Sequence, residues 1–180
     1  MKKLAAAVIV GLLAVGSLAF EPWTLWTRST VDEALPEVTS APRVPVLNSQ
    51  PSSAPTPSAP TPTASVKPVE LTRGRFMSQE HGTTGRARVV ELADGRRILR
   101  LEDFSTSNGP DLHVWLSDRT AGGSWFKYDE GRAVQLGKLK ATDGNHNYEI
   151  PAGADLAGLK SVVIWCERFS VAFGSAPLNR

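Results

Sequence analysis

The sequence predicts an all-β fold, an antiparallel β-sandwich or barrel-like domain, preceded by an N-terminal transmembrane helix and a Pro-rich disordered linker. Three observations support this prediction. From Val69 onward, short runs of alternating polarity are separated by turn signals, which is typical of sandwiches and barrels. No window in this region has convincing helical periodicity. A stretch of Pro, Ser, Thr and Ala, Gln50 to Pro68, separates these runs from a hydrophobic N-terminus.

The first predicted unit, residues 1–26, is a signal-anchor helix with interfacial tryptophans. The uncharged stretch Leu4 to Phe20 has 17 residues, the lower limit for crossing ~30 Å of hydrocarbon. Trp23 and Trp26 follow it, as in an interfacial aromatic belt. We therefore expect a membrane contact through this helix.

The charges before this helix predict its orientation. Lys2 and Lys3 favour a cytoplasmic N-terminus, so the C-terminal domain is expected outside the cytoplasm of a single-pass cell-membrane protein. The alternative is a protein secreted after signal cleavage near Ala19, because small residues occupy the positions that a signal peptidase needs.

The second predicted unit, residues 27–68, is a flexible linker. Ser29 to Leu35 is interpreted as a short helical or irregular start, after which prolines interrupt the chain. The composition of the remainder buries too little apolar surface to fold. At ~3.1 Å per residue, roughly thirty residues of polyproline-like chain would hold a domain up to ~90 Å from the membrane.

The third predicted unit, residues 69–180, is the β domain. Asp94-Gly95 supplies the positive φ of a hairpin turn, and Asn108 to Asp111 and Asp143-Gly144 are further turn signals. The predicted strands are 85–92, 97–101, 111–117, 133–136, 147–150, 161–166 and 169–174.

The stretch Ser161 to Gly174 is the most apolar part of this domain and contains the only cysteine, Cys166. In its first strand both faces are apolar, which predicts a central strand covered on both sides. The first face is formed by Val162, Ile164 and Cys166, and the second by Val163 and Trp165. In its second strand, Phe169, Val171 and Phe173 are expected to share a face.

The charge argues against nucleic-acid binding, and the cysteine count excludes a disulfide within the chain. A net charge of +2, with no basic stripe interleaved with aromatics, predicts no nucleic-acid binding. A single cysteine allows no intramolecular disulfide, so in an exported protein it is buried, metal-bound, paired between chains or reactive.

Several longer motifs occur in order along the domain: Gly74–Phe76, Leu99–Phe104, Thr106–Leu112, Asn147–Pro151 and Val162–Gly174. With these motifs, residues 69–180 resemble the DM-thirteen domain family, and the hydrophobic N-terminus together with Val31–Pro36 resembles its membrane-anchored bacterial members. The resemblance implies a β-sandwich with a redox or electron-transfer role outside the cytoplasm. The family's single cysteine, proposed as a redox thiol or a haem ligand, matches Cys166.

The candidate site is therefore centred on Cys166, as a redox thiol or as a cofactor ligand. The cofactor is unknown. Copper is one candidate, because two histidines, a cysteine and a distant methionine form a blue-copper site, and haem is another. The candidate cofactor-binding residues are His81, His113 and His146, although none lies on the loop of Cys166. A thiol cycle would need a redox partner protein or a second copy of the domain.

The alternative function is a non-catalytic extracellular module that binds a ligand or a protein, with Cys166 as a core residue. Its candidate surface is formed by loops 105–110, 122–132 and 143–147, with Asn108, Trp125, Phe126 and Asn145 as the candidate binding residues. Hydrolase and nucleotide-binding motifs are absent from the sequence, so either function is favoured over a classical enzyme.

Overall fold

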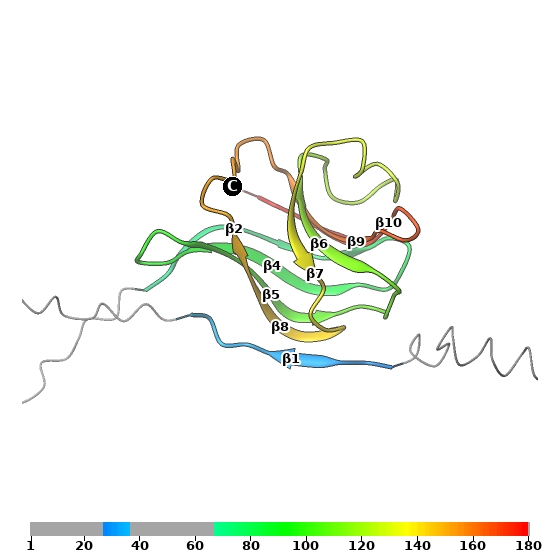
Figure 1. The fold of residues 1–180 in the computed structure, drawn as a ribbon, viewed down its shortest axis with the longest axis horizontal. Coiled ribbons are helices and arrows are strands. Elements are labelled where there is room, and N and C mark those ends of the chain that lie inside the picture. Colours follow the sequence, from blue (N-terminus) through cyan, green and yellow to red (C-terminus); the bar gives the residue numbers. More distant parts are fainter. Residues whose placement is uncertain (1–26, 37–66, 180) are drawn as a thin grey trace, which may run out of the picture.

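The structure, a computed structural model, describes residues 27–36 and 67–179. In this part of the chain ten strands form two five-stranded sheets that pack face to face (Figure 1). The predicted all-β sandwich is confirmed, and the described residues contain no helix. Accordingly, no helix in this part could cross a membrane, and the predicted anchor lies outside it.

The first sheet has the strand order β1-β8-β5-β4-β2, and the second has the order β3-β10-β9-β6-β7. All strand pairs are antiparallel except β1 with β8, which is parallel. The strands of the first sheet are β1 (Thr30–Asp32), β8 (Asp143–Ile150), β5 (Arg97–Ser105), β4 (Thr84–Glu91) and β2 (Val69–Arg75). Those of the second are β3 (Met77–Ser78), β10 (Val171–Pro177), β9 (Ser161–Cys166), β6 (Leu112–Ser117) and β7 (Ala133–Lys138).

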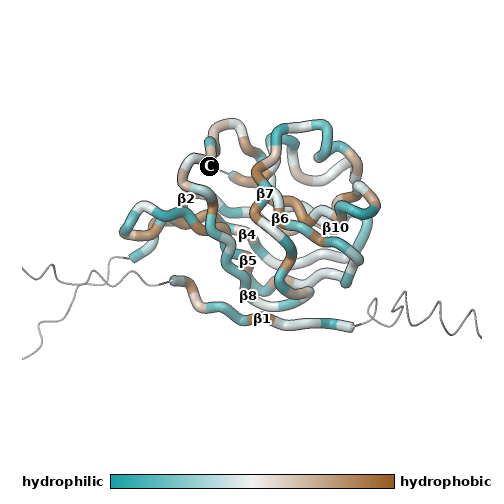
Figure 2. The backbone as a smooth tube through the Cα atoms, in the orientation of Figure 1, coloured by the Kyte–Doolittle hydropathy of each residue, from teal (hydrophilic) through white to brown (hydrophobic). Residues whose placement is uncertain are grey.

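Strand β9 has the buried central position that the sequence predicts. Its residues Val162, Ile164 and Cys166 join the core between the two sheets. Val163 and Trp165 point to the outer face, where the β6–β7 connection covers them with Tyr128. Hydrophobic residues follow the strands, whereas the turns are mostly hydrophilic (Figure 2).

The strand after β9 begins later than predicted. Residues Glu167 to Ser170 form an exposed turn, and β10 begins at Val171. Ser170 has φ 51°, which turns the chain sharply and takes Phe169 off the strand. Phe169 is therefore 64% exposed, while Val171 and Phe173 face the core as expected.

Residues 27–36 also differ from the prediction, which assigned them to the linker. Here they lie along the first sheet, with β1 paired to β8. Contacts with residues about a hundred positions away hold them, because Arg28 donates to Asp143 (2.9 Å) and Glu33 accepts from Lys140 (2.8 Å). Gly144 allows the close approach, since a Cβ there would lie 2.0 Å from the Val31 carbonyl oxygen.

The start of β8 is a second correction. The sequence predicts a turn at Asp143-Gly144 and a strand only from Asn147, but β8 already begins at Asp143. Pairing with β5 on one side and β1 on the other extends the strand over these polar residues.

Candidate functional site

Cys166 is the last residue of β9, and it is fully buried in the core between the sheets. Leu112 of β6 and Val171 of β10 are its strand partners. The next residue, Glu167, donates its N–H to the Asp111 carbonyl oxygen (3.0 Å) at the surface. The thiol therefore lies one residue from an exposed turn, behind close-packed apolar side chains.

An aromatic cluster lies behind Cys166, on the outer face of the same sheet. Trp115 and Trp165 stack with ring centroids 5.0 Å apart, and Tyr128 packs edge-on against Trp165 at 6.3 Å. The Tyr128 hydroxyl hydrogen-bonds with Ser175 Oγ (2.9 Å) and donates to Gln79 Oε1 (3.1 Å). Burial raises the pKa of Tyr128 above its usual value. These contacts show a packed and largely satisfied layer that closes the outer face.

His81 lies in the loop between β3 and β4, at the same end of the sandwich as Cys166. Its Nε2 is 2.6 Å from Glu80 Oε2, and its ring centroid is 4.0 Å from that of Phe173. The Phe173 side chain, a core residue, therefore lies beneath the imidazole. The contacts of the His81 ring with Phe173 and with the Glu80 carboxylate explain its position without a cofactor.

His113 belongs to a surface ion cluster on β6 and β7. Its Nε2 is 3.0 Å from Asp111 Oδ1, and Lys138 Nζ is 3.3 Å from the same oxygen. The hydrogen bond from His113, followed by that from Lys138, lowers the pKa of the Asp111 carboxyl. The imidazole thus has a carboxylate partner on the surface.

His146 is fully buried in β8 and faces the core, and the sequence-based placement in a turn was wrong. Its Nε2 is 3.0 Å from the Asp143 carbonyl oxygen, whereas its Nδ1 has no hydrogen-bond partner. Phe104 and Tyr148 pack edge-on against the ring, at 5.5 and 6.4 Å between centroids. Burial lowers the pKa of this imidazole, because the apolar surroundings disfavour its charged form.

The three histidines therefore occupy three different environments. Among the residues that the structure describes, no group of three or more His, Cys, Asp and Glu side chains could hold a metal ion. Three surface cavities of about 540, 470 and 180 Å³ are lined neither by Cys166 nor by a histidine. The arrangement does not fit a blue-copper centre, in which the ligands converge on one point, or a haem pocket around the Cys166 sulfur.

Two of the predicted binding residues, Asn108 and Asn145, make hydrogen bonds within the domain. Asn108 accepts the N–H of Gly109 (2.9 Å) and lines the smallest of these cavities. Asn145 lies within β8 and not in a loop. Its amide contacts Asp32 of β1, and its Oδ1 accepts the Asp103 N–H (3.1 Å). Asn145 thus helps to attach β1.

The other two predicted binding residues are exposed. Trp125 is 41% and Phe126 is 57% exposed, in the connection between β6 and β7. Sequence reasoning missed Phe169, which joins them as the third exposed aromatic side chain in the described part of the chain. The polar pair Glu167-Arg168 beside it was the available signal, because a turn that includes the next residue would expose it.

The fold and the buried cysteine define a class of protein, an all-β sandwich domain with a single core thiol. Residues 75–178, more than half of the chain, match the family described as Electron transfer DM13, and the chain belongs to this family. The family description associates the domain with electron transfer. No curated protein and no solved structure matches the chain.

Proposed function

We propose that this protein has a redox or electron-transfer role on the outer side of a cell membrane, centred on Cys166. The observation that carries the proposal is the match to an electron-transfer family over residues 75–178, which include the only cysteine of the chain. The uncharged stretch Leu4 to Phe20, with two lysines before it, supports the membrane location.

The surroundings of Cys166 favour thiol chemistry with a partner protein over ligation of copper or haem. The histidines do not converge on the sulfur, and none of the three cavities reaches it. In the thiol route, Cys166 and a partner thiol form a disulfide, two protons pass to water, and two electrons pass to an acceptor that the partner carries. The thiolate is the reactive form.

Access to the sulfur requires local opening, because Cys166 is fully buried. The exposed turn from Glu167 to Ser170 follows Cys166 directly, and its displacement would expose the sulfur. Its opening breaks the hydrogen bond from the Glu167 N–H to the Asp111 carbonyl oxygen and the pairing of Cys166 with Val171. Such sub-global openings are a normal part of native-state behaviour.

A thiol titration of the native full-length chain tests this role, together with its absorption spectrum and metal content. We expect slow but complete reaction of Cys166 without denaturant, at a rate that becomes independent of reagent concentration when opening limits it. A Cys166→Ala/Ser124→Cys variant is the control for reagent quality, since Ser124 is exposed in a loop.

Two results decide between the redox routes. A visible band that disappears in Cys166→Ala would make Cys166 a cofactor ligand and replace the thiol route. A colourless, metal-free protein whose thiol reacts only after unfolding would overturn both redox routes.

A second candidate is a non-catalytic binding module, in which Cys166 is a core residue. The specific observation in its favour is the exposure of Trp125, Phe126 and Phe169 beside a fully buried thiol. Exposed apolar patches mark contact sites. The same titration separates the candidates, because the binding module predicts a thiol that is inert until the protein unfolds.

A further inference from the structure

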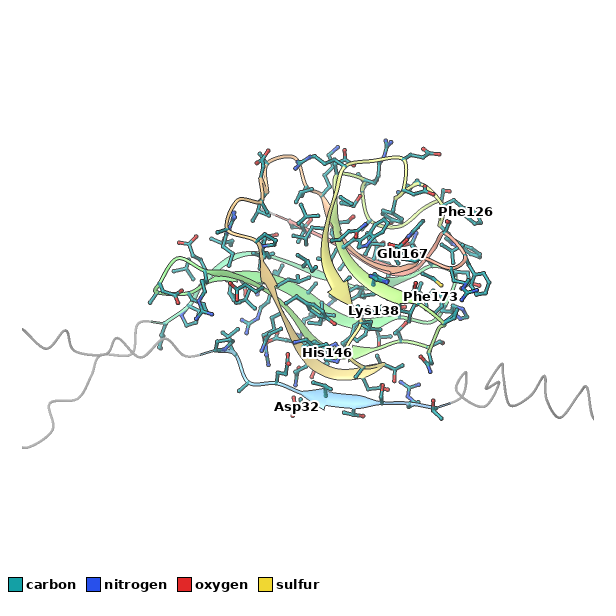
Figure 3. The ribbon with its side chains drawn as sticks, viewed as in Figure 1. Asp32, Phe126, Lys138, His146, Glu167 and Phe173 are labelled. Carbon is teal, nitrogen blue, oxygen red and sulfur yellow. The ribbon has the colours of Figure 1, made fainter. Side chains whose placement is uncertain are left out.

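All three exposed aromatic side chains of the described residues lie toward one end of the sandwich. We call this surface, formed by Trp125, Phe126 and Phe169, the aromatic end. The backbone positions it, because the Ala172 N–H of β10 donates to the Trp125 carbonyl oxygen (2.9 Å). Phe169 lies in the turn that leads into the same strand, and Phe126 projects outward at this end (Figure 3).

Core packing does not require these rings. The outer face of β9 is already covered by Tyr128, which is fully buried, whereas Trp125 and Phe126 stay exposed and their ring centroids lie 6.4 Å apart. Phe169 sits in a turn that needs no large apolar residue. Exposed aromatic surface of this kind is typical of a contact site.

The N-terminal segment enters the domain at this same end. Arg28 donates to Ser105 Oγ (2.6 Å) at the end of β5 and to the Asp143 carboxylate at the start of β8. The neighbouring Thr106 hydroxyl is 2.8 Å from the Thr83 hydroxyl, which in turn donates to the Phe173 carbonyl oxygen of β10 (3.1 Å). In Figures 1 and 3 the amino end of β1 points to the side on which Phe126 and Glu167 lie.

The chain between this entry point and the predicted anchor is short. Residues 21–26, the interfacial part of the predicted anchor unit, lie between the end of the uncharged stretch at Phe20 and Thr27, and fully extended they reach about 20 Å. A domain of this size has a radius of gyration of about 13 Å. With the proposed anchor, this short connection would hold the domain close to the lipid surface, in place of the distance of up to ~90 Å that a linker over residues 27–68 would allow.

We propose that the aromatic end docks on the lipid bilayer interface, with Trp125, Phe126 and Phe169 among the lipid headgroups. This inference rests on the membrane anchorage in the proposed function. Tryptophan partitions to the headgroup region, where its ring is sheltered and its polar N–H stays hydrated. Phenylalanine has no polar group, and in surface-bound segments its ring inserts at the boundary between headgroups and acyl chains. Trp23 and Trp26, in the short connection, have the same chemistry.

The opposite end of the sandwich exposes no aromatic side chain among the described residues, although Val69 and Leu71 are exposed near it and the aromatic end itself exposes Glu167 and Arg168. The β4–β5 turn and its neighbours expose charged side chains, Glu91, Asp94, Arg96 and Glu149, around the largest of the cavities. Burial of these charges in a membrane interface would be costly. The position of the three exposed aromatic side chains therefore predicts the orientation of the domain, with the aromatic end at the membrane and the β4–β5 turn facing away from it.

The experiment uses the full-length chain in lipid nanodiscs, with its five tryptophans replaced by 5-fluorotryptophan. Fluorine NMR spectra are recorded with and without lipids that carry a nitroxide at the headgroup, and Trp125→Phe assigns its resonance. We expect loss of most of the Trp125 signal. Trp115 and Trp165, buried on the outer face of the sheet, serve as internal references that keep more of theirs.

Trp23 and Trp26 report separately on the anchor. If the signals of Trp23 and Trp26 broaden and that of Trp125 does not, the anchor is in the membrane but the aromatic end does not dock on it. The aromatic end would then be a candidate surface for a protein ligand. If neither they nor Trp125 broaden, the anchorage fails and the inference fails with it. The variant Phe126→Ser/Phe169→Ser should restore Trp125 intensity, and unchanged broadening in it would contradict docking through these rings.

Discussion

His146 combines a polar ring with an apolar environment. The ring is fully buried, its Nδ1 has no hydrogen-bond partner, and burial lowers its pKa below the usual value of 6.5. The charged groups that act on it are Glu33, Lys140 and Asp143, and their effects partly cancel. The neutral imidazole is therefore the form that the fold accommodates.

This environment predicts a loss of stability as the pH falls. Below about pH 6.5 the unfolded chain binds a proton at His146 that the folded chain takes up only at lower pH, so the free energy of unfolding decreases. The slope that this residue contributes should not exceed about 1.4 kcal/mol per pH unit, the limit for one proton. Urea titrations between pH 7 and pH 5 measure it.

His146→Phe is the matched variant for this pH dependence. Phenylalanine keeps an aromatic ring between Phe104 and Tyr148 but cannot titrate. The slope in this pH range should decrease in the variant. An unchanged slope would assign the effect to other groups and contradict the prediction. The carboxylates of Glu33, Asp111 and Asp143 have lowered pKa values, so their contributions are lost only at more acidic pH.

At the level of elements, Gly174 of β10 lies in close contact with Thr83, the residue before β4. A Cβ at Gly174 would lie 2.5 Å from the Thr83 Cβ and 2.7 Å from its hydroxyl oxygen. That hydroxyl also makes the contacts with Thr106 and with the Phe173 carbonyl oxygen. The missing side chain thus lets the β3–β4 connection, which leads from the second sheet to the first, pack closely against β10.

Gly174→Ala should therefore destabilise the protein, by about 1–3 kcal/mol, as overpacked sites typically do. Gly82→Ala is the control, because a Cβ there meets nothing within 4 Å. Its unfolding midpoint in urea should stay near that of the parent protein or rise slightly. Equal effects of the two substitutions would show that the contact with Thr83 is not the cause.

The attachment of β1 gives a second prediction for an element. Arg28→Ala/Glu33→Ala removes the side chains that bind Asp143 and Lys140 across the sheet edge. Hydrogen exchange at the amides of Glu33 and Asp143, which bond across this edge, should become several-fold faster. Strand β9 should keep its protection. Glu149→Ala, at an exposed position on the same β8, should change neither, and a similar effect from it would contradict this account.

Alternation along the sequence predicts most of the strands and the faces of β9, because each central strand is buried by its own apolar side chains. It does not predict β1, β2 and β3. In β2 only one residue is buried, and β1 is held by ion pairs with residues about a hundred positions away. Local patterns carry no signal for such edges.

The site shows the same division. The sequence identifies Cys166 and the side of β9 on which it lies. The environments of His81, His113 and His146 depend on Phe173, Asp111 and Asp143, and their geometry follows from the assembled sheets. The exposure of Phe169 depends on where the β9–β10 turn ends, because β10 begins only at Val171 and the positive φ of Ser170 takes Phe169 off the strand.

At the scale of the whole molecule, both ends of the Pro-rich stretch attach near the same region. Leu35 packs against Val90, Leu92 and Ile98, and Val69 pairs with Glu91. About thirty residues, 37–66, connect these two points on one domain. In this arrangement the stretch does not determine how far the domain stands from the membrane.

Deletion of residues 51–60 should therefore leave the domain in place. About twenty residues would remain, enough for about 65 Å when extended. The unfolding midpoint and the broadening of Trp125 by headgroup nitroxides should both match the parent protein. A change in Trp125 broadening on deletion would support the stalk and contradict the attachment of the domain through β1.

The parallel pairing of β1 also bears on what counts as one folding unit. The family match begins at residue 75, and a fragment cut there would leave out β1, nearly all of β2, and Leu35. The backbone edges of β8 and β4 would then be free to pair with other chains. Because β1 is tethered to the domain it completes, it acts as an intramolecular strand at high effective concentration. The Pro-rich stretch thus keeps β1 near the edge of β8, so that β1 pairs with this edge before a strand of another molecule does.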